Sequence, residues 1–128
     1  MKKIIFDTNF ILTCVKQKID FIRELKEDGY ELLLPKQVDS ELKKISIDKK
    51  KKVSERELAK VSLEIIDKNK DKFKIIELEK KFVDAGLLRL KEGEEIIIAT
   101  LDRQIRRLLK GKFKFLGITK RKKLEITS

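Results

Sequence analysis

Two short apolar runs, one near each end of the chain, lead directly to an aspartate. Lys3–Phe6 precedes Asp7, and residues 95–99 precede Thr100 and Asp102. β-Branched runs without polar alternation are typical of strands that are buried on both faces, as in parallel sheets. The carboxyl ends of parallel strands meet at one edge of a sheet, where ligands bind. If these two strands are neighbours, Asp7 and Asp102 converge there, and a divalent metal ion would allow both to stay ionised.

Two further acidic residues, Glu41 and Asp84, lie near the starts of helices that follow predicted strands. Right-handed crossovers would bring them to the same edge of the sheet. Clustered carboxylates suit Mg²⁺ or Mn²⁺ and therefore phosphoryl chemistry, because hard cations prefer oxygen ligands. Each residue alone has a structural alternative. Asp7 and Asp102 could cap helices, Asp84 could favour a helix N-terminus through the dipole, and Glu41 could simply be exposed.

The charge of the chain points to a polyanionic partner. Lysine and arginine total 33 against 22 acidic residues, which gives a net charge of +11. The excess is concentrated in residues 103–128 and in residues 43–60, which include the run Lys49–Lys52. Basic stripes of this kind favour nucleic acid as the partner, with a solvated basic surface as the alternative.

The residues that the chain lacks narrow the chemistry. There is no histidine, which excludes a histidine general base, a Ser-His-Asp triad and a histidine-containing zinc site. The single Cys14 cannot form an internal disulfide and is expected to pack in the interior. We see no apolar run long enough for a membrane span and no leader at the start, so we expect a cytoplasmic protein with no membrane partner.

The alternation of strands and helices along the chain predicts the fold class. Strands separated by helices imply an α/β fold, here a three-layer α/β/α sandwich with a mainly parallel central sheet. We find no internal repeat or domain boundary, so residues 1–128 are expected to form a single domain. The expected strands are 3–6, 30–34, 73–78, 95–99 leading to Asp102, and 113–118. The expected helices are 10–26, one carrying Glu41, Leu42 and Ile45, 54–68 with a capping box beginning at Ser54, 82–91, and 103–110.

Four motifs in order along the chain resemble those of the PIN domain, a compact nuclease fold. They are Asp7-Thr8-Asn9, Val38-Asp39-Ser40-Glu41-Leu42, Val83-Asp84-Ala85 and Ala99-Thr100-Leu101-Asp102-Arg103. The similarity covers nearly the whole chain. The ending, from Thr100 through Arg107 to Leu116, is most similar to stand-alone archaeal members, which in turn resemble eukaryotic nucleases that process ribosomal RNA precursors.

The resemblance implies a ribonuclease that depends on Mg²⁺ or Mn²⁺. Asp7, Glu41, Asp84 and Asp102 would be its catalytic and metal-binding residues, and Thr8, Asn9 and Thr100 would hold these carboxylates by hydrogen bonds. Two positions depart from the pattern, because Val83 and Gln104 stand where that branch often has acids. Metal binding could therefore be weaker or limited to one ion.

Basic residues beside Asp102 are candidates for RNA binding. Arg103, Arg106, Arg107 and Lys110 are spaced so that several share one helical face, and we expect Arg106 and Arg107 to be exposed. Their alternative is plain surface charge.

Three function classes remain open on the sequence. The first is a metal-dependent ribonuclease that acts on structured or single-stranded RNA, with a ribosomal RNA precursor as one candidate substrate. The second is the toxin ribonuclease of a toxin–antitoxin pair. The third is a non-catalytic RNA-binding scaffold, which the residues at positions 83 and 104 make credible. The partners considered are RNA, a second copy of the chain, and either an antitoxin or a ribosome-assembly partner.

Overall fold

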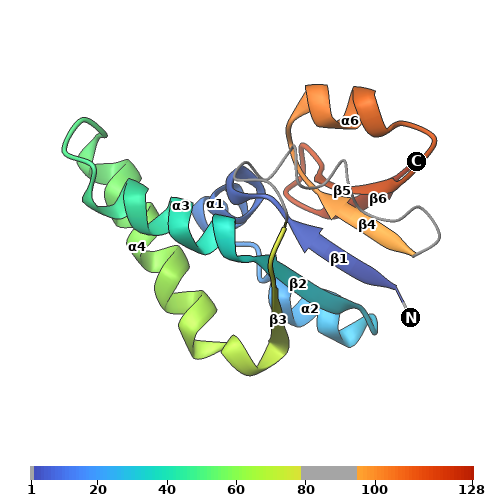
Figure 1. Ribbon diagram of the computed structural model, residues 1–128, viewed down its shortest axis with the longest axis horizontal. Helices are drawn as coiled ribbons and strands as arrows, with labels where there is room; N and C mark the ends of the chain where they lie inside the picture. The colour runs from blue at the N-terminus through green and yellow to red at the C-terminus, as the bar shows by residue number, and fades with distance from the viewer. Residues whose placement is uncertain (1, 79–94) are drawn as a thin grey trace.

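A six-stranded sheet is the centre of the fold, with helices on both sides of it (Figure 1). The computed structural model describes residues 2–78 and 95–128. The strand order across the sheet is β3-β2-β1-β4-β5-β6. All neighbours are parallel except the last pair, in which β6 runs antiparallel to β5. The strands are β1 (Lys3–Phe6), β2 (Glu31–Pro35), β3 (Phe73–Ile76), β4 (Ile96–Ala99), β5 (Lys114–Ile118) and β6 (Leu124–Thr127).

Helices occupy the connections from β1 to β2, from β2 to β3 and from β4 to β5. They are α1 (Thr8–Lys16), α2 (Phe21–Glu27), α3 (Lys36–Ile47), α4 (Val53–Lys68), the short 3₁₀ helix η1 (Lys70–Lys72) and α6 (Arg103–Leu109). The helix expected over residues 82–91 lies outside the described residues. Within the described parts of the chain, no helix is both long enough and apolar enough to cross a membrane. The predicted α/β class with a mainly parallel central sheet is confirmed.

The two strands that lead to aspartates are neighbours, as the sequence predicted. β1 pairs with β4 in parallel, with Phe6 opposite Ala99. The backbone N–H of Asp7 continues this pairing by donating to the carbonyl oxygen of Ala99 at 2.9 Å. Because both strands end at the same level, the residues that follow them emerge at one edge of the sheet.

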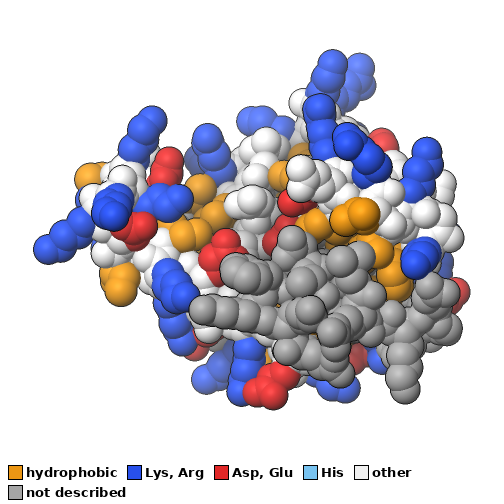
Figure 2. Space-filling view, turned by 45° about the horizontal axis from the view of Figure 1, so that its top comes forward, with side chains coloured by type: hydrophobic (Ala, Val, Ile, Leu, Met, Phe, Trp, Pro, Cys, Tyr) orange, Lys and Arg blue, Asp and Glu red, His pale blue; other side chains and the backbone are white. Residues whose placement is uncertain are grey.

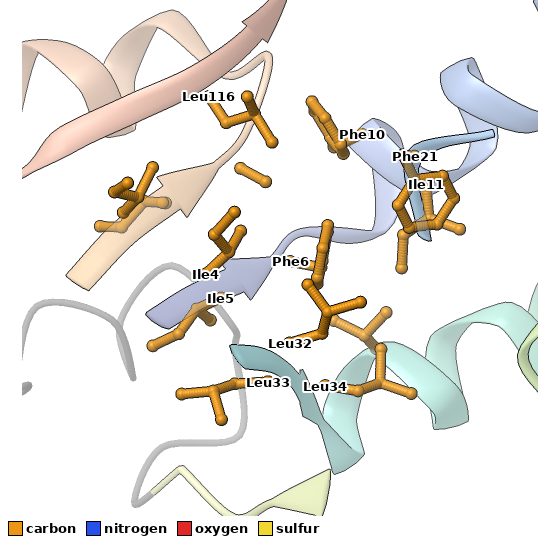
Figure 3. Packing of buried hydrophobic residues seen from close by; sticks show 14 of the residues in the cluster. Ile4, Ile5, Phe6, Phe10, Ile11, Phe21, Leu32, Leu33, Leu34 and Leu116 are labelled. Carbon is orange, nitrogen blue, oxygen red and sulfur yellow. The ribbon is translucent and has the colours of Figure 1, made fainter. Parts of the chain in front are cut away.

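Burial explains why these strands are apolar throughout. In β1 every residue after Lys3 is buried, and in β4 every residue is buried, so both faces of the central strands are covered. Phe6, at the end of β1, packs against Phe10, Phe21 and Phe73, with ring centroids 5.3–6.0 Å apart. Figure 3 shows Phe10, Phe21 and Ile11 on the helical side of Phe6. This aromatic cluster fixes α1 and α2 against the end of the strand that leads to Asp7.

The single helix expected over residues 10–26 is wrong, because two helices are present. α1 ends at Lys16, and Lys18 adopts a left-handed backbone with φ of 59°. Asp20 then caps α2 by accepting a hydrogen bond from the backbone N–H of Arg23 at 3.3 Å. The apolar spacing continues across the break because both helices bury their residues in one core, so periodicity alone could not locate it.

The capping box expected at Ser54 is also wrong. α4 begins at Val53 after Lys52, which makes no side-chain cap, so Ser54 already lies inside the helix.

The last strand, β6, was not expected from the sequence. Its residues are half-buried or exposed, because it lies at the edge of the sheet and is paired only with β5. Its sequence therefore lacks the apolar run that marked the central strands.

α3 and α4 form a helical hairpin that projects from the end of the sheet (Figure 1). The turn between them contains the four consecutive lysines Lys49–Lys52, all exposed. Ile47 and Val53, on either side of this turn, are also exposed, at 75% and 64%. The hairpin thus ends in a tip that is rich in positive charge.

Candidate active site

Asp7 stands at the junction of β1 and α1, where the sheet edge meets the start of a helix. It is the N-cap residue of α1, and its Oδ1 accepts a hydrogen bond from the backbone N–H of Thr8 at 2.8 Å. Its other oxygen, Oδ2, accepts from the hydroxyl of Thr100 at 2.9 Å. The capping role considered as an alternative is therefore real. It occupies one oxygen only, and the second oxygen faces the residues that follow β4.

Thr100 links the two aspartates that follow the central strands. The side chain is fully buried, and its Oγ1 donates to Asp7 while accepting from the backbone N–H of Asp102 at 3.1 Å. One hydroxyl thus uses its donor and an acceptor lone pair to fix both neighbours. The same hydroxyl therefore positions a carboxylate and forms a turn contact with the backbone.

Asp102 is exposed and caps α6. Its Oδ1 accepts from the backbone N–H groups of Gln104 and Ile105 at 2.8 and 3.3 Å. An aspartate at this position is stabilised by the helix dipole as well as by these hydrogen bonds. The neighbouring Gln104 contributes its backbone amide to this cap, whereas an acid there would add a further carboxylate.

Glu41 reaches the same region from α3. Val38 and Leu42 on this helix are fully buried, which holds the helix against the core and fixes the position of the exposed Glu41. Oε2 of Glu41 accepts a hydrogen bond at 2.9 Å from the hydroxyl of Thr8, which is itself buried. Two threonine hydroxyls therefore orient two carboxylates, one from each side of the β1–α1 junction.

The pKa of Asp7 reflects both its burial and the negative charges near it. Burial raises the pKa of Asp7, and the hydrogen bonds from Thr100 and from the backbone of Thr8 lower it. The negative charges of Glu41 and Asp102 raise this pKa further, and the net direction is upward. Glu41 and Asp102 therefore both repel the ionised Asp7, and a bound cation would relieve this repulsion.

Of the other predicted site residues, the structure describes Asn9 but not Asp84. Asn9 is exposed in the first turn of α1, and Asp84 and Val83 lie outside the described residues. Within residues 2–78 and 95–128, no group of three or more acidic or cysteine side chains is compact enough to hold a metal ion. The donor chemistry of Asp7, Glu41 and Asp102 nevertheless fits a hard divalent cation, since all three offer carboxylate oxygens.

Cys14, which the sequence placed in the interior, is buried within the core. Burial raises the pKa of its thiol to about 12. At neutral pH it is therefore a thiol and a poor nucleophile, in keeping with a packing role.

The four basic residues of the α6 region do not behave alike. Arg103, Arg107 and Lys110 are exposed, as was expected for Arg107, and they line an open groove of about 280 Å³ together with Arg106 and Phe115. The expectation that Arg106 is exposed is wrong. It is half-buried, and its Nε and Nη2 donate inward to the backbone carbonyl oxygen of Thr100 at 3.1 and 3.0 Å. Helical spacing could place this arginine beside its neighbours but could not show which way it turns.

Gly117 is a second residue of this region that sequence reasoning missed. It lies in β5, and a Cβ atom built on it would come within 2.5 Å of Nη2 of Arg106. A glycine inside a predicted strand is itself a signal of close approach by another group, and this signal was present in the expected strand 113–118.

The surface around the acidic residues is mostly basic. Figure 2 shows Lys and Arg side chains gathered at the tip of the α3–α4 hairpin and over α6, with Asp and Glu side chains between them. An acidic centre flanked by positive charge attracts a polyanion to its edges while leaving its middle suited to a cation.

Comparison with known proteins identifies the family and supports the fold. A curated relative, Ribonuclease VapC4 of Methanocaldococcus jannaschii, is 27% identical over 131 residues, which span 98% of this chain and 97% of the relative. A solved structure titled "Structure of the PIN domain endonuclease Utp24" superposes with a TM-score of 0.74 at 23% identity, covering 97% of this chain and 90% of that one, and supports the fold. The family model described as "PIN like domain" matches residues 4–121. Since this match spans most of the sequence, the chain belongs to the PIN-like domain family.

Proposed function

We propose that the protein is a metal-dependent ribonuclease that hydrolyses phosphodiester bonds of RNA. The observation that carries the proposal is that Asp7, Glu41 and Asp102 are joined at one edge of the sheet through the hydroxyls of Thr8 and Thr100. In keeping with this geometry, the charges of Glu41 and Asp102 raise the pKa of Asp7. The curated relative named as a ribonuclease supports the reaction, and its match extends over 98% of this chain.

Asp7 and Asp102 are proposed to hold Mg²⁺ or Mn²⁺, with Asp84 completing the carboxylate set. Such an ion lowers the pKa of a bound water and offsets negative charge on the phosphate. Glu41 either joins the ligands or orients the attacking water. The hydroxyls of Thr8 and Thr100 hold Glu41 and Asp7 in orientation, since each donates a hydrogen bond of 2.9 Å to its carboxylate.

RNA is proposed to reach this site across the basic groove on α6. Arg103, Arg107 and Lys110 are exposed along this groove, whereas Phe115 at its base is buried. Guanidinium and ammonium groups bind phosphates, so these three side chains can contact the RNA backbone.

The cellular role stays a prediction. Processing of ribosomal RNA and action as a toxin use the same site, so the chemistry of the site does not separate them. The genes beside this one would, since an antitoxin gene immediately upstream favours a toxin, whereas ribosome-assembly genes favour RNA processing.

The proposal is tested by cleavage of a single-stranded RNA with Mn²⁺, with Mg²⁺ and with a chelator. The wild-type protein should cleave only with metal, and Asp102→Asn should lower the rate by about 100-fold or more. Asparagine caps helices about as well as aspartate, so this substitution removes the charge and keeps the start of α6. Calorimetry should also show Mn²⁺ binding that weakens in the variant.

Asp20→Asn is the matched control, because Asp20 is likewise an aspartate at the N-cap of a helix, α2. It should cleave RNA like the wild type. Full metal-dependent cleavage by the Asp102→Asn protein would contradict the assignment. A wild-type protein that binds RNA but neither binds Mn²⁺ at millimolar concentration nor cleaves would instead identify an RNA-binding scaffold.

A further inference from the structure

Arg106 makes four separate interactions, all of them directed into the protein. Its Nε and Nη2 both donate to the carbonyl oxygen of Thr100, at 3.1 and 3.0 Å. Its Nη1 lies 3.5 Å from Oγ1 of Thr127 in β6, and its Cζ lies 5.4 Å from the ring centroid of Phe115 in β5. The carbonyl oxygen of Thr100 thus accepts from one edge of the guanidinium, and the ring of Phe115 in β5 lies against its face.

Gly117 makes room for this arrangement. A Cβ atom at this position would stand 2.5 Å from Nη2 and 3.5 Å from Cζ of Arg106, and these are the nearest atoms it would meet. The backbone of Gly117 does not have a positive φ, so an L-amino acid fits its conformation. The guanidinium of Arg106 therefore occupies the space that a side chain at Gly117 would need.

The carbonyl that Arg106 holds belongs to the residue that orients both aspartates. The hydroxyl of Thr100 donates to Asp7 and accepts from the backbone N–H of Asp102. Thr100 follows β4 and lies beyond its last residue, Ala99, so its conformation is not set by the strand ladder alone. Two hydrogen bonds to its carbonyl oxygen fix the peptide plane, and with it the direction of the hydroxyl.

We propose that Arg106 is a positioning residue of the candidate active site, which holds Thr100 so that its hydroxyl aligns Asp7 and Asp102. The inference rests on the proposed ribonuclease function and assigns Arg106 a role different from that of its exposed neighbours. Arg103 and Arg107 turn toward solvent and can meet phosphates, whereas three nitrogens of Arg106 already donate within the protein. Gly117 contributes to this positioning, because its lack of a side chain leaves room for the guanidinium of Arg106.

Two variants test the proposal by different routes. Arg106→Lys keeps the positive charge, but a lysine has no planar fork to donate twice to one carbonyl. Gly117→Ala keeps the arginine and pushes its guanidinium away, and the fold should survive because the clash is with the flexible end of a side chain. Each should lower kcat by about 10- to 100-fold and leave the affinity for RNA within about twofold.

Arg23→Lys is the matched control, since it makes the same exchange at an exposed arginine that is ion-paired with Asp20 on α2. Its kcat should equal that of the wild type. The double variant Arg106→Lys with Gly117→Ala should have a kcat no lower than that of the more impaired single variant, because both changes remove the same contact between Arg106 and Thr100.

A readout without metal or RNA separates this proposal from the proposed function. Hydrogen exchange of the Asp102 amide, which donates to Thr100, should be faster in both variants than in the wild type, with the amides of β1 unchanged. This comparison remains decisive even if the wild-type protein cleaves no RNA. Unchanged exchange at Asp102, or a loss of RNA affinity with kcat intact, would overturn the proposal and make Arg106 an RNA contact or a packing residue.

Discussion

At the scale of single residues, the candidate site is an arrangement of charge held by hydroxyl groups. Asp7 has one oxygen on a helix N-terminus and the other on the hydroxyl of Thr100. These hydrogen bonds favour its ionised form, yet burial and two nearby carboxylates outweigh them. The ionised Asp7 therefore lowers the free energy of unfolding, as charged groups in functional sites often do.

Asp7→Asn should stabilise the metal-free protein at neutral pH and abolish metal-dependent cleavage. The pKa of Asp7 is raised in the folded state, so the folded protein binds this proton more tightly than the unfolded chain does. The resulting penalty is complete above the folded pKa, and it vanishes as the pH falls to the unfolded pKa of about 3.9. Thermal melting of both proteins across this pH range should show a gain in melting temperature that disappears in acid.

The control for the Asp7 prediction is Asp71→Asn, at an exposed aspartate in η1. Its melting temperature should follow that of the wild type at every pH. An Asp7→Asn protein that melts below the wild type at neutral pH would mean that the cap and the hydroxyl contact dominate. Retained cleavage by this variant would remove Asp7 from the active site.

Thr100→Val tests the hydroxyl that joins the two aspartates. Valine keeps the shape of this fully buried side chain but removes the donor to Asp7 and the acceptor for the Asp102 amide. The loss should destabilise the protein by about 1 kcal/mol, because the part-buried amide of Asp102 and the carboxylate of Asp7 each lose a hydrogen-bond partner. It should also raise the pKa of Asp7 further, since the hydroxyl contact lowers that pKa. Urea unfolding and NMR titration of the Asp7 carboxyl measure the two effects, and an unchanged unfolding midpoint would contradict the first.

At the scale of elements, the break between α1 and α2 decides where the aromatic cluster lies. α1 carries Phe10 and α2 carries Phe21, and both rings pack on Phe6 at the end of β1. The reversal at Lys18, with φ of 59°, allows the second helix to turn back onto the same core. A lysine is an unfavourable residue for this left-handed conformation, because its Cβ crowds the backbone.

Lys18→Gly should therefore stabilise the protein, by about 0.5–1 kcal/mol, because glycine adopts positive φ without steric cost. The matched control is Lys16→Gly, two residues earlier and still inside α1, where glycine should instead destabilise by about 0.5–1 kcal/mol. Chemical unfolding should show a higher free energy of unfolding for Lys18→Gly and a lower one for Lys16→Gly if the helix breaks at Lys18. Two losses of equal size would indicate a continuous helix.

At the scale of the whole molecule, positive charge flanks the acidic centre from two directions. One group lies on α6, and the other is the exposed turn Lys49–Lys52 at the tip of the α3–α4 hairpin (Figure 2). An RNA that reached both would cross the carboxylates between them. Phosphate contacts at the tip would then add affinity without touching the chemical step.

Replacing Lys49–Lys52 with glutamine should weaken RNA binding and reduce its dependence on salt, with kcat unchanged. Each lost phosphate contact lowers the slope of log affinity against log salt by about 0.7 for single-stranded RNA. Binding titrations over a range of salt concentrations measure this slope. The matched control removes the same charge at the other end of α4 and beyond, by changing the exposed lysines Lys68, Lys70, Lys72 and Lys74. Equal effects from the two sets would mean that only net charge matters.

The sequence by itself determined the central elements of this protein. Buried parallel strands require unbroken apolar residues, so β1, β2 and β4 could be located, and the aspartates that follow β1 and β4 could be placed at one edge. The ordered motifs around Asp7, Glu41 and Asp102 indicated the family. These features are local, because each depends on residues adjacent in the chain and on the general rule that parallel strands end together.

Only the tertiary structure decided how these local features meet. Periodicity predicted one helix where two are present, since both bury residues in the same core, and the edge strand β6 left no apolar signature. Arg106 belonged to a basic helix face in sequence, yet its partners Thr100 and Gly117 lie on segments that pairing of β4 with β5 brings beneath it. The direction of a side chain depends on which neighbours the fold supplies, and those neighbours are distant in sequence.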